Sequence, residues 1–376
     1  MRLGELRQQS AGYKAFIPNK FPPGEEWGFT KSLMLKHSEA AMLIGKLDGI
    51  TQLLPDIDFF LFMYVRKDAA SSSQIEGTQA TMIDAIEAEA KTADKLPKDV
   101  DDILHYVKAL NYGMERLKEF PMSLRFIREL HKVLMEGARS SHHADPGEFR
   151  KSQNWIGGTT PASARFVPPP PNDMQTALGD FENFLHAKDS VLPLLKIGLI
   201  HAQFETIHPF LDGNGRTGRL LISLYLWQQK MLERPVLFLS SYFKRHQQEY
   251  YDRLDGYRRG EVEQWINFLL DGVVEISQQA ITTAKKITLI READMEKVQT
   301  LGKRASVSAV MVLRRLFALP IVNVNTIGEW TSFSRPGAQH VIDRFVNLGI
   351  LEQKDKTETY GRSYIYTRYV DAFAEE

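Results

Sequence analysis

Residues 208–219 of this chain read His-Pro-Phe-Leu-Asp-Gly-Asn-Gly-Arg-Thr-Gly-Arg. Apolar runs with helical spacing lead into the segment over 192–207 and out of it over 220–231, which predicts a polar turn between two buried helices. We expect the outgoing helix to begin at Asn214 or Gly215, so that its free backbone N–H groups face the turn. Glycines let an anion approach these groups closely, and the helix dipole favours negative charge there. The segment therefore predicts a phosphate-binding site.

The side chains of the same segment suit a reaction at phosphate. Arg216 and Arg219 share one face of the outgoing helix, and arginine can bind phosphate through paired hydrogen bonds. Asp212 supplies a hard oxygen, which suits Mg²⁺ held jointly by one carboxylate and substrate phosphates. His208, with an ordinary pKa of about 6.5, can accept a proton from a hydroxyl group. Each residue alone is unremarkable in a protein, but the combination predicts attack of a hydroxyl on a nucleotide phosphate.

The composition is that of an ordinary folded protein. The chain has 376 residues, 43% hydrophobic and 25% charged, which suggests two or three domains. The formal net charge is zero, which argues against a strongly basic nucleic-acid-binding protein. Cysteine is absent, which excludes disulfides, thiolate catalysis and cysteine zinc sites. The first residues lack an apolar signal core, and no uncharged run approaches the ~18 residues of a membrane span, so we expect a cytoplasmic protein.

The apolar spacing is mostly helical, and helix breakers divide the chain into four parts. We expect an N-terminal helical region over 1–99, irregular over its first 28 residues, and a core over 100–275. A connecting helix over 276–300 then leads to a separate module over 301–376. The first expected helix buries Leu33, Leu35, Ala40, Met42, Leu43 and Leu47. Further helices are expected at 57–70, 100–117, 123–135, 174–184, 192–207, 220–231, 242–257 and 262–284.

The module at 301–376 has the pattern of a helix-turn-helix with a wing. Its third helix carries Arg335, His340 and Arg344, opposed by Asp343, and this basic stripe is too weak to predict phosphate binding. Nucleic acid is therefore a less favoured partner of the module than a protein or a second copy of the chain in a homodimer. Three helices and two strands are expected here, at 306–317, 326–330, 335–348, 350–353 and 363–367.

The segment at 208–219 resembles the signature of the Fic family, His-x-Phe-x-(Asp/Glu)-Gly-Asn-(Gly/Lys)-Arg-x-x-Arg, and matches it at every defined position. The resemblance extends over residues 60–275. It implies a mainly α fold, in which a Fic helical core with a short β-hairpin flap precedes the C-terminal winged helix-turn-helix domain. It also implies a protein adenylyltransferase, which transfers AMP from ATP to a Ser, Thr or Tyr hydroxyl of a target protein with Mg²⁺ as cofactor.

The resemblance implies a role for each matched position. His208 is implied to be the general base for the target side chain, and Asp212 to be the Mg²⁺ ligand. Arg219 is implied to contact the γ-phosphate, and Phe210 is expected to be a core residue that fixes the loop. The implied phosphate cradle consists of Gly213, Asn214, Gly215 and Arg216.

A second segment, Ser72-Ser73-Gln74-Ile75-Glu76-Gly77, is similar to the family's inhibitory motif, (Ser/Thr)-x-x-x-Glu-(Gly/Asn). Its position in an N-terminal helical region resembles the class with an intrachain inhibitory helix. The similarity implies that Glu76 pairs with Arg219 and repels the triphosphate, with Ser72 as the other constrained residue, so a latent enzyme is expected. The same glutamate could instead orient a water that removes AMP from a modified target, and the sequence leaves this alternative open.

The segment around residues 154–167 lies where the family has its flap. Trp155, Ile156 and Gly157 are expected to hold a target segment by strand addition and so place its hydroxyl beside His208. One aromatic residue of the pair Tyr250 and Tyr251 is expected to stack on adenine, and a packed core position is the alternative for each.

Three functional hypotheses follow. The first is a protein adenylyltransferase restrained by Glu76. The second keeps the fold but changes the chemistry to removal of AMP or transfer of another phosphate-containing group. The third, of a different class, is a transcriptional regulator that senses a nucleotide and binds an operator through 301–376. The presence of His208 favours catalysis, because a pure sensor does not need a base.

Overall fold

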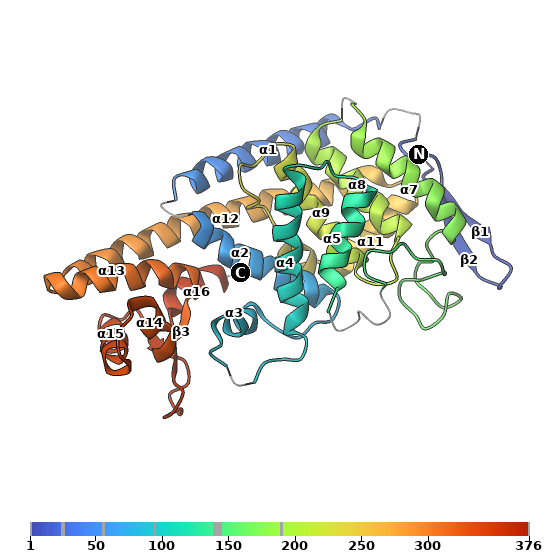
Figure 1. Cartoon of the computed structure of the whole chain (residues 1–376). Coiled ribbons are helices and arrows are strands. Elements are labelled where there is room, and N and C mark those ends of the chain that lie inside the picture. The colour runs from blue at the N-terminus through green and yellow to red at the C-terminus, as the bar shows by residue number, and fades with distance from the viewer. Residues whose placement is uncertain are drawn as a thin grey trace.

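The computed structural model describes residues 2–23, 27–54, 57–93, 95–137, 145–188 and 191–374, and it is mainly helical, as predicted (Figure 1). The helices are α1 (Lys31–Gln52), α2 (Ile57–Ile75), α3 (Met82–Ala90), α4 (Val100–Leu117), α5 (Leu124–Met135), α7 (Pro171–His186), α8 (Pro193–Ile207), α9 (Asn214–Gln228), α10 (Ser240–Arg245), α11 (Gln247–Arg258), α12 (Val262–Gln299), α13 (Lys303–Ala318), α14 (Val324–Thr331), α15 (Arg335–Asn347) and α16 (Thr367–Ala374). The strands are β1 (Gly4–Gln8), β2 (Lys14–Pro18), β3 (Ile321–Asn323), β4 (Glu352–Gln353) and β5 (Ser363–Ile365).

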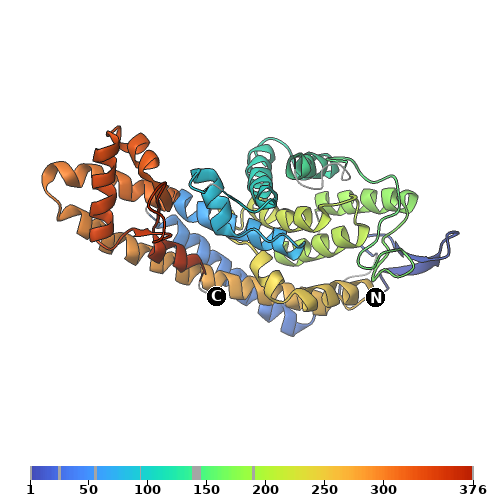
Figure 2. The same ribbon diagram turned by 90° about the horizontal axis from the view of Figure 1, so that it is seen from below.

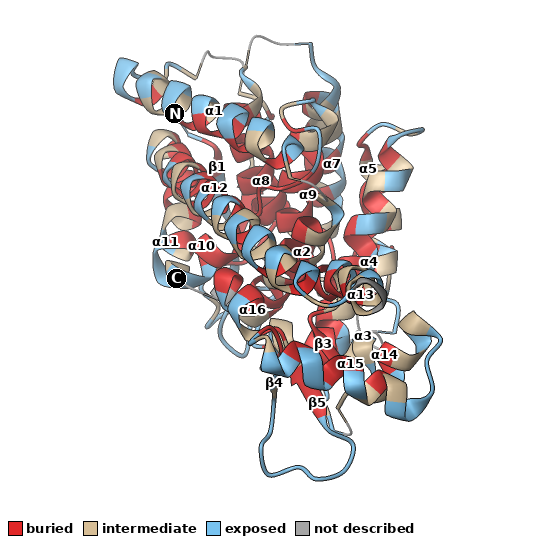
Figure 3. Cartoon of the chain, turned by 90° about the vertical axis from the view of Figure 1, so that its left-hand side faces the viewer, coloured by how far each residue is buried: buried red, intermediate tan, exposed pale blue. Residues whose placement is uncertain are grey.

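Helices α8 and α9 form the centre of the molecule. Every residue of α8 from Leu194 to Ile207 is buried, which explains why the apolar run before the motif shows no polar face. Helices α4, α5, α7, α11 and α12 pack around this pair, and Figure 3 shows the buried centre inside partly exposed outer helices. The turn between α8 and α9 is therefore held at both ends by a rigid core, which suits a site that must keep its geometry.

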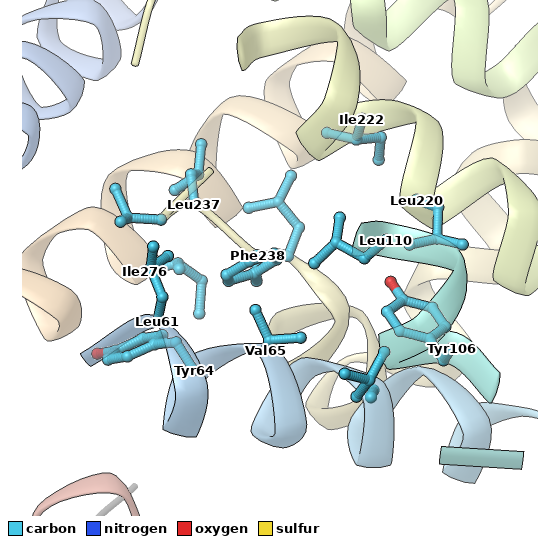
Figure 4. Close-up of a cluster of buried hydrophobic side chains, with 14 of the residues drawn as sticks. Leu61, Tyr64, Val65, Tyr106, Leu110, Leu220, Ile222, Leu237, Phe238 and Ile276 are labelled. Carbon is cyan, nitrogen blue, oxygen red and sulfur yellow. The ribbon is translucent and has the colours of Figure 1, made fainter. Parts of the chain in front are cut away.

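Helix α2 is firmly attached to this core. Leu61, Tyr64 and Val65 of α2 meet Leu110 of α4 and Phe238 in a cluster of buried side chains (Figure 4). Burying such side chains stabilises the fold by roughly 1.5–3 kcal/mol each. The C-terminal end of α2, which carries the segment 72–77, is thus fixed relative to α9.

The N-terminal residues were expected to be irregular, and this expectation is wrong. Strands β1 and β2 pair antiparallel around a turn in which Gly12 has a φ of +87°. The backbone N–H of Phe16 donates to the carbonyl of Val167 at 2.9 Å, so the hairpin packs beside the predicted flap. The prolines that suggested irregular structure end the second strand or follow it, where the strand pairing does not need their N–H groups.

Several expected helices are present but begin or end at residues other than those predicted. In α1, Leu33, Ala40, Leu43 and Leu47 are buried, but Leu35 and Met42 are 64% and 67% exposed, because the buried face is narrower than the apolar spacing suggested. Helix α2 continues beyond residue 70 to Ile75. The helix expected at 242–257 is divided into α10 and α11 at His246, and α12 continues unbroken from 262 to 299.

Helix α12 runs beside α1 along the length of the molecule and leads into the C-terminal module (Figure 2). The module contains the expected helices and two expected strands, together with β3 and α16, which the sequence analysis missed. Strand β5 lies between β3 and β4 in an antiparallel sheet. The Tyr369 hydroxyl donates to the carbonyl of Phe317 at 3.0 Å, and Lys354 forms an ion pair with Glu87 of α3. The assignment of this module as a winged helix stays a prediction.

Among the described residues, no helix is both long enough and apolar enough to cross a bilayer.

Candidate active site

A cavity of about 580 Å³ opens at the turn between α8 and α9. A site for a small molecule typically occupies about 300–1,000 Å³, so the cavity is large enough for a nucleotide. Its walls come from the end of α2, the segment around residue 156, the end of α8, the start of α9 and helix α11. The residues that line the cavity include Glu76, Glu205, His208, Asp212, Arg219 and Tyr251.

The side chain of Asn214, which was expected to form part of the phosphate cradle, closes the turn between α8 and α9. Asn214 Oδ1 accepts from the N–H of Phe210 at 2.9 Å, and Asn214 Nδ2 donates to the carbonyl of the same residue at 2.9 Å. Gly213 adopts a φ of +75°, which a residue with a Cβ rarely adopts, and α9 begins directly after it. Asn214 therefore shapes the loop through its side chain. Its backbone, with those of Gly213 and Gly215, lines the cavity at the N-terminus of α9.

His131 of α5 packs against the turn between α8 and α9 and supports it. The sequence analysis missed this residue. Its ring stacks on Phe210 with centroids 3.7 Å apart and an angle of 1° between the planes. The N–H of Gly147 donates to Nδ1 at 2.9 Å, so Nε2 carries the proton and donates to the Asp212 carbonyl at 2.9 Å. Burial lowers the pKa of His131 to about 4, so the ring is neutral near pH 7. This neutral ring fixes the position of Phe210, confirmed here as a buried core residue.

Replacement of His131 by leucine is expected to lower the free energy of unfolding by about 1–3 kcal/mol, because the Gly147 N–H and the Asp212 carbonyl lose their partner. Denaturant unfolding followed by circular dichroism measures this change. Replacement of the exposed His340 on α15 is the matched control and should leave the stability within ~0.5 kcal/mol of the parent. Equal stabilities of the parent and the His131 variant would contradict the supporting role.

Asp212 fits the predicted role of a Mg²⁺ ligand. Its side chain is 46% exposed and lines the cavity beside the N-terminus of α9. No cluster of three or more His, Cys, Asp or Glu side chains suited to a metal occurs in the part of the chain that the structure describes. Mg²⁺ is commonly held by one or two carboxylates together with substrate phosphates, so a single aspartate beside a phosphate site meets this requirement.

The two arginines of α9 point in different directions. Arg216 is buried and does not line the cavity. Its Nη1 lies 3.6 Å from Asp102 Oδ1, and its Nη2 lies 3.8 Å from Asp212 Oδ2. Arg216 was expected to form part of the phosphate cradle. Its guanidinium is instead directed toward α4 and α5. Arg219 lines the cavity, and Ser72 fixes it through bonds from Nε to Oγ at 2.8 Å and from Nη2 to the backbone carbonyl at 2.9 Å.

Glu76 forms an ion pair with Arg219 inside the cavity. Its Oε1 accepts from Arg219 Nη2 at 2.8 Å, and the glutamate side chain is 40% exposed against 2% for the arginine. Although burial acts against the charge, Glu76 and the other negative groups nearby raise the pKa of Arg219 above its ordinary range. A Cβ at Gly215 would lie 2.2 Å from Glu76 Oε1, so the glycine provides the space for this pair. The structure thus brings together Ser72, Glu76 and Arg219 from segments 143 or more residues apart.

His208 follows the last residue of α8 in the left-handed region, with a φ of +49°. Arg150 Nε donates to its carbonyl at 2.9 Å and holds this uncommon conformation. The ring lines the cavity and is 17% exposed. Burial and the nearby charges of Arg258 and Arg150 lower its pKa to about 3, so the imidazole is neutral near pH 7.

A second titratable group in the cavity, Glu205, was missed because the run over 192–207 was interpreted as an apolar buried helix despite its polar residues. Burial raises its pKa from 4.5 to about 7, and Glu76 adds to the shift, while Arg219 opposes it. The folded state therefore favours the protonated carboxyl group. This contribution to stability is complete below pH 4.5 and is lost as the pH rises through about 7.

The free energy of unfolding is therefore expected to fall between pH 4.5 and pH 7 in the parent relative to Glu205→Gln, by at most ~1.4 kcal/mol per pH unit. Denaturant unfolding of both proteins at four pH values measures the difference. The comparison removes the opposite effect of the buried histidines, whose lowered pKa values make stability rise with pH over the same range. A constant difference between the two proteins across these pH values would show that Glu205 does not titrate there.

The segment around residues 154–167 forms another wall of the cavity. Ile156 and Phe166 form an antiparallel bridge, so a short flap is present. Arg165 ties it to α11 through Asp252 at 2.6 Å and Asp255 at 2.7 Å. Trp155, Ile156 and Gly157 all line the cavity, with Trp155 38% exposed.

The two tyrosines of α11 differ in environment. Tyr250 is 1% exposed, its ring stacks on Phe243, and its hydroxyl lies 2.8 Å from His201 Nε2. Tyr250 is therefore packed in the core, as is His201, although unlike His201 it also lines the cavity. Tyr251 lines the cavity and is partly exposed, so it is the better candidate for a contact with adenine.

The fold and the cavity define a mainly helical protein with a cavity at the N-terminus of a buried helix, where the sequence predicted an anion-binding site. Residues 34–115 match the Fic/DOC family N-terminal region and residues 121–226 match the Fic/DOC family, which together make up half of the chain. The chain belongs to the Fic/DOC family.

Curated relatives include proteins named "Protein adenylyltransferase Fic" from Aedes aegypti, 33% identical over 170 residues, and from Drosophila grimshawi, 30% identical over 206 residues. These matches cover 44% and 52% of this chain but only 30% and 39% of the relatives. A Fic family protein from Desulfovibrio desulfuricans G20 has a similar fold, with a TM-score of 0.58 at 18% identity over 92% of this chain and 98% of that one. A Fic domain containing signaling protein from Bacteroides thetaiotaomicron superposes with a TM-score of 0.53 at 20% identity, over 68% of this chain and 97% of its own.

Proposed function

We propose that this protein transfers AMP from ATP to a hydroxyl side chain of a target protein and that Glu76 restrains the reaction. The names of the curated relatives support the reaction type. The observation that carries the proposal is one cavity in which a neutral histidine, an aspartate and an arginine surround the N-terminus of a buried helix. This is the arrangement that nucleophilic attack on a nucleotide phosphate requires.

The cavity residues divide the work of such a reaction. The N–H groups at the start of α9 and the Arg219 guanidinium bind the phosphates of ATP. His208 accepts the proton of the target hydroxyl while the oxygen attacks the α-phosphorus and pyrophosphate leaves. Asp212 would hold Mg²⁺, which neutralises phosphate charge when it is bound. The flap positions the target beside His208, where Trp155 and Ile156 contact it.

The ion pair with Glu76 opposes this use of Arg219. A guanidinium that donates to a carboxylate at 2.8 Å is not available to a γ-phosphate, and the negative glutamate also repels the triphosphate. ATP would then bind weakly or with its α-phosphate misplaced. The protein is therefore proposed to be latent until Glu76 leaves the cavity.

The mass of the product tests the reaction type. Glu76→Gly protein is incubated with ATP, Mg²⁺ and cell lysate, and modified polypeptides are identified by mass spectrometry. We expect hydroxyl residues that carry a whole AMP group. Polypeptides that carry phosphate alone would exclude AMP transfer, and the absence of any modification would contradict catalysis on ATP.

Removal of AMP from a modified target is a second candidate function, and the position of Glu76 favours it. The glutamate is 40% exposed and lines the same cavity as His208, so it can orient a water toward an AMP group. The unmodified sequence should then release AMP from a modified target faster than Glu76→Gly does, which chromatography of free AMP measures. Equal release by both proteins would exclude this role.

A further inference from the structure

Glu205 lies one helical turn before His208, and the two side chains face each other. Glu205 Oε2 lies 3.8 Å from His208 Nδ1, and the side chains are only 7% and 17% exposed. Neither His208 Nδ1 nor Glu205 Oε1 has a hydrogen-bond partner among the described residues. Unpartnered buried polar atoms are costly, and a rotation of the carboxyl group would bring its unpartnered oxygen toward Nδ1.

The space around Glu205 is shaped for its carboxyl group. A Cβ at Gly218 of α9 would lie 2.7 Å from Glu205 Oε1, so a larger residue there would displace the carboxyl group. Arg258 Nη2 already donates to the backbone carbonyl of Glu205 at 3.2 Å, so this carbonyl can offer His208 only its second lone pair. The carboxyl group, whose Oε2 lies 3.8 Å from Nδ1 and whose Oε1 has no partner among the described residues, is the less occupied acceptor.

We propose that Glu205 is a positioning residue for His208, whose Nδ1–H it binds, so that the unprotonated Nε2 faces the cavity. This inference rests on the AMP transfer proposed above. When Nε2 takes the proton of the target hydroxyl, the hydroxyl oxygen bonds to the α-phosphorus. The bond from the α-phosphorus to the bridging oxygen breaks, and pyrophosphate leaves with the electron pair. The Glu205 carboxylate then stabilises the imidazolium that has formed.

The charged groups around Glu205 and His208 connect this pair with the proposed inhibition by Glu76. Arg219 of α9, Arg258 of α11 and Glu76, the residue after α2, act on the Glu205 carboxyl group. The two arginines favour its ionised form and Glu76 opposes it, so departure of Glu76 favours the carboxylate that can accept Nδ1–H. On the other side of the pair, the groups that act on His208 are Arg258, Arg150, Asp212 and the backbone of Glu205.

The kinetic test uses Glu76→Gly protein, with Glu205→Gln or Glu205→Leu added. Glutamine keeps an acceptor without the charge, and leucine removes both. We expect kcat to fall about 10-fold with glutamine and about 100-fold with leucine, within the range of general acid–base effects. The KM for ATP should change by less than about threefold, because the interaction is made in the transition state. Gln203→Leu, which removes another buried polar side chain of α8, is the matched control and should leave kcat unchanged.

Two further readouts separate positioning from a structural role. The ¹⁵N chemical shifts of His208 should report a proton on Nδ1 in the Glu76→Gly background and a change of tautomer after Glu205→Leu. The limb of the kcat–pH profile that reports ionisation of Glu205 should lie below pH 7 in the Glu76→Gly background, because Glu76 no longer raises the pKa of Glu205, and it should disappear in Glu205→Gln. The glutamine variant also covers the case in which the leucine variant fails to fold. An unchanged tautomer together with an unchanged kcat in folded variants would overturn the proposal. If Glu76→Gly protein transfers no AMP, the proposed function fails, whereas the tautomer still tests the contact with Glu205.

Discussion

Glu76→Gly is expected to raise the rate of AMP transfer by between 10-fold and 100-fold. The substitution frees Arg219 from a 2.8 Å bond and removes the carboxylate that repels ATP. A hydrogen bond between charged groups contributes about 1.5–3 kcal/mol, and each 1.4 kcal/mol corresponds to about tenfold in an equilibrium constant. Incorporation of label from α-labelled ATP into protein, at ATP concentrations below KM, measures the change.

The chain offers a closely matched control for this prediction. Glu275 has a 40% exposed side chain, as Glu76 has, and it pairs at 2.7 Å with Arg245; neither of these two residues lines the cavity. Glu275→Gln should therefore leave the transfer rate at the parent level, while Glu76→Gln should raise it. A gain of similar size in both variants would assign the effect to general loosening of the fold. No gain in Glu76→Gly would contradict the proposed restraint.

His208→Ala in the Glu76→Gly background is expected to lower AMP transfer by about 10²–10⁴-fold, the usual contribution of a general base. ATP binding should persist, because the N–H groups of α9 and Arg219 remain in place. Label transfer and equilibrium binding of ATP, measured on the same protein, separate the two effects.

A second histidine provides the control for this variant. His201 lies seven residues earlier on α8 and is also buried, and the ring bonds to the Gly218 carbonyl and the Tyr250 hydroxyl instead of lining the cavity. His201→Gln should therefore lower stability far more than it lowers kcat. Persistence of AMP transfer in the folded His208→Ala protein would exclude His208 as the base, and loss of ATP binding would assign it to the nucleotide site.

The parts of this site that the sequence predicted are those encoded by local pattern. The apolar runs on both sides of 208–219 fix helices α8 and α9, and Gly213 marks the turn between them. The pairing of Glu76 with Arg219 was also anticipated, because each lies in a motif whose spacing resembles that of a known family.

The parts that escaped prediction depend on contacts between distant segments. His131 supports a loop about 80 residues away, and nothing in its own helix distinguishes it from another buried residue. The direction of Arg216 is set by Asp102 and Met135 on neighbouring helices, which no spacing within α9 can reveal. The hairpin β1–β2 is stabilised partly by the flap, so its local sequence gave only a weak signal.

Competition between Glu76 and ATP for Arg219 is most directly tested by the affinity for Mg²⁺–ATP. Calorimetric titration of the unmodified sequence, Glu76→Gly and Glu275→Gln compares the three dissociation constants under the same conditions. We predict that Glu76→Gly binds ATP at least about tenfold more tightly than the other two, as the loss of a competing charged bond requires. Equal dissociation constants for all three proteins would contradict the claim that the ion pair keeps ATP from its site.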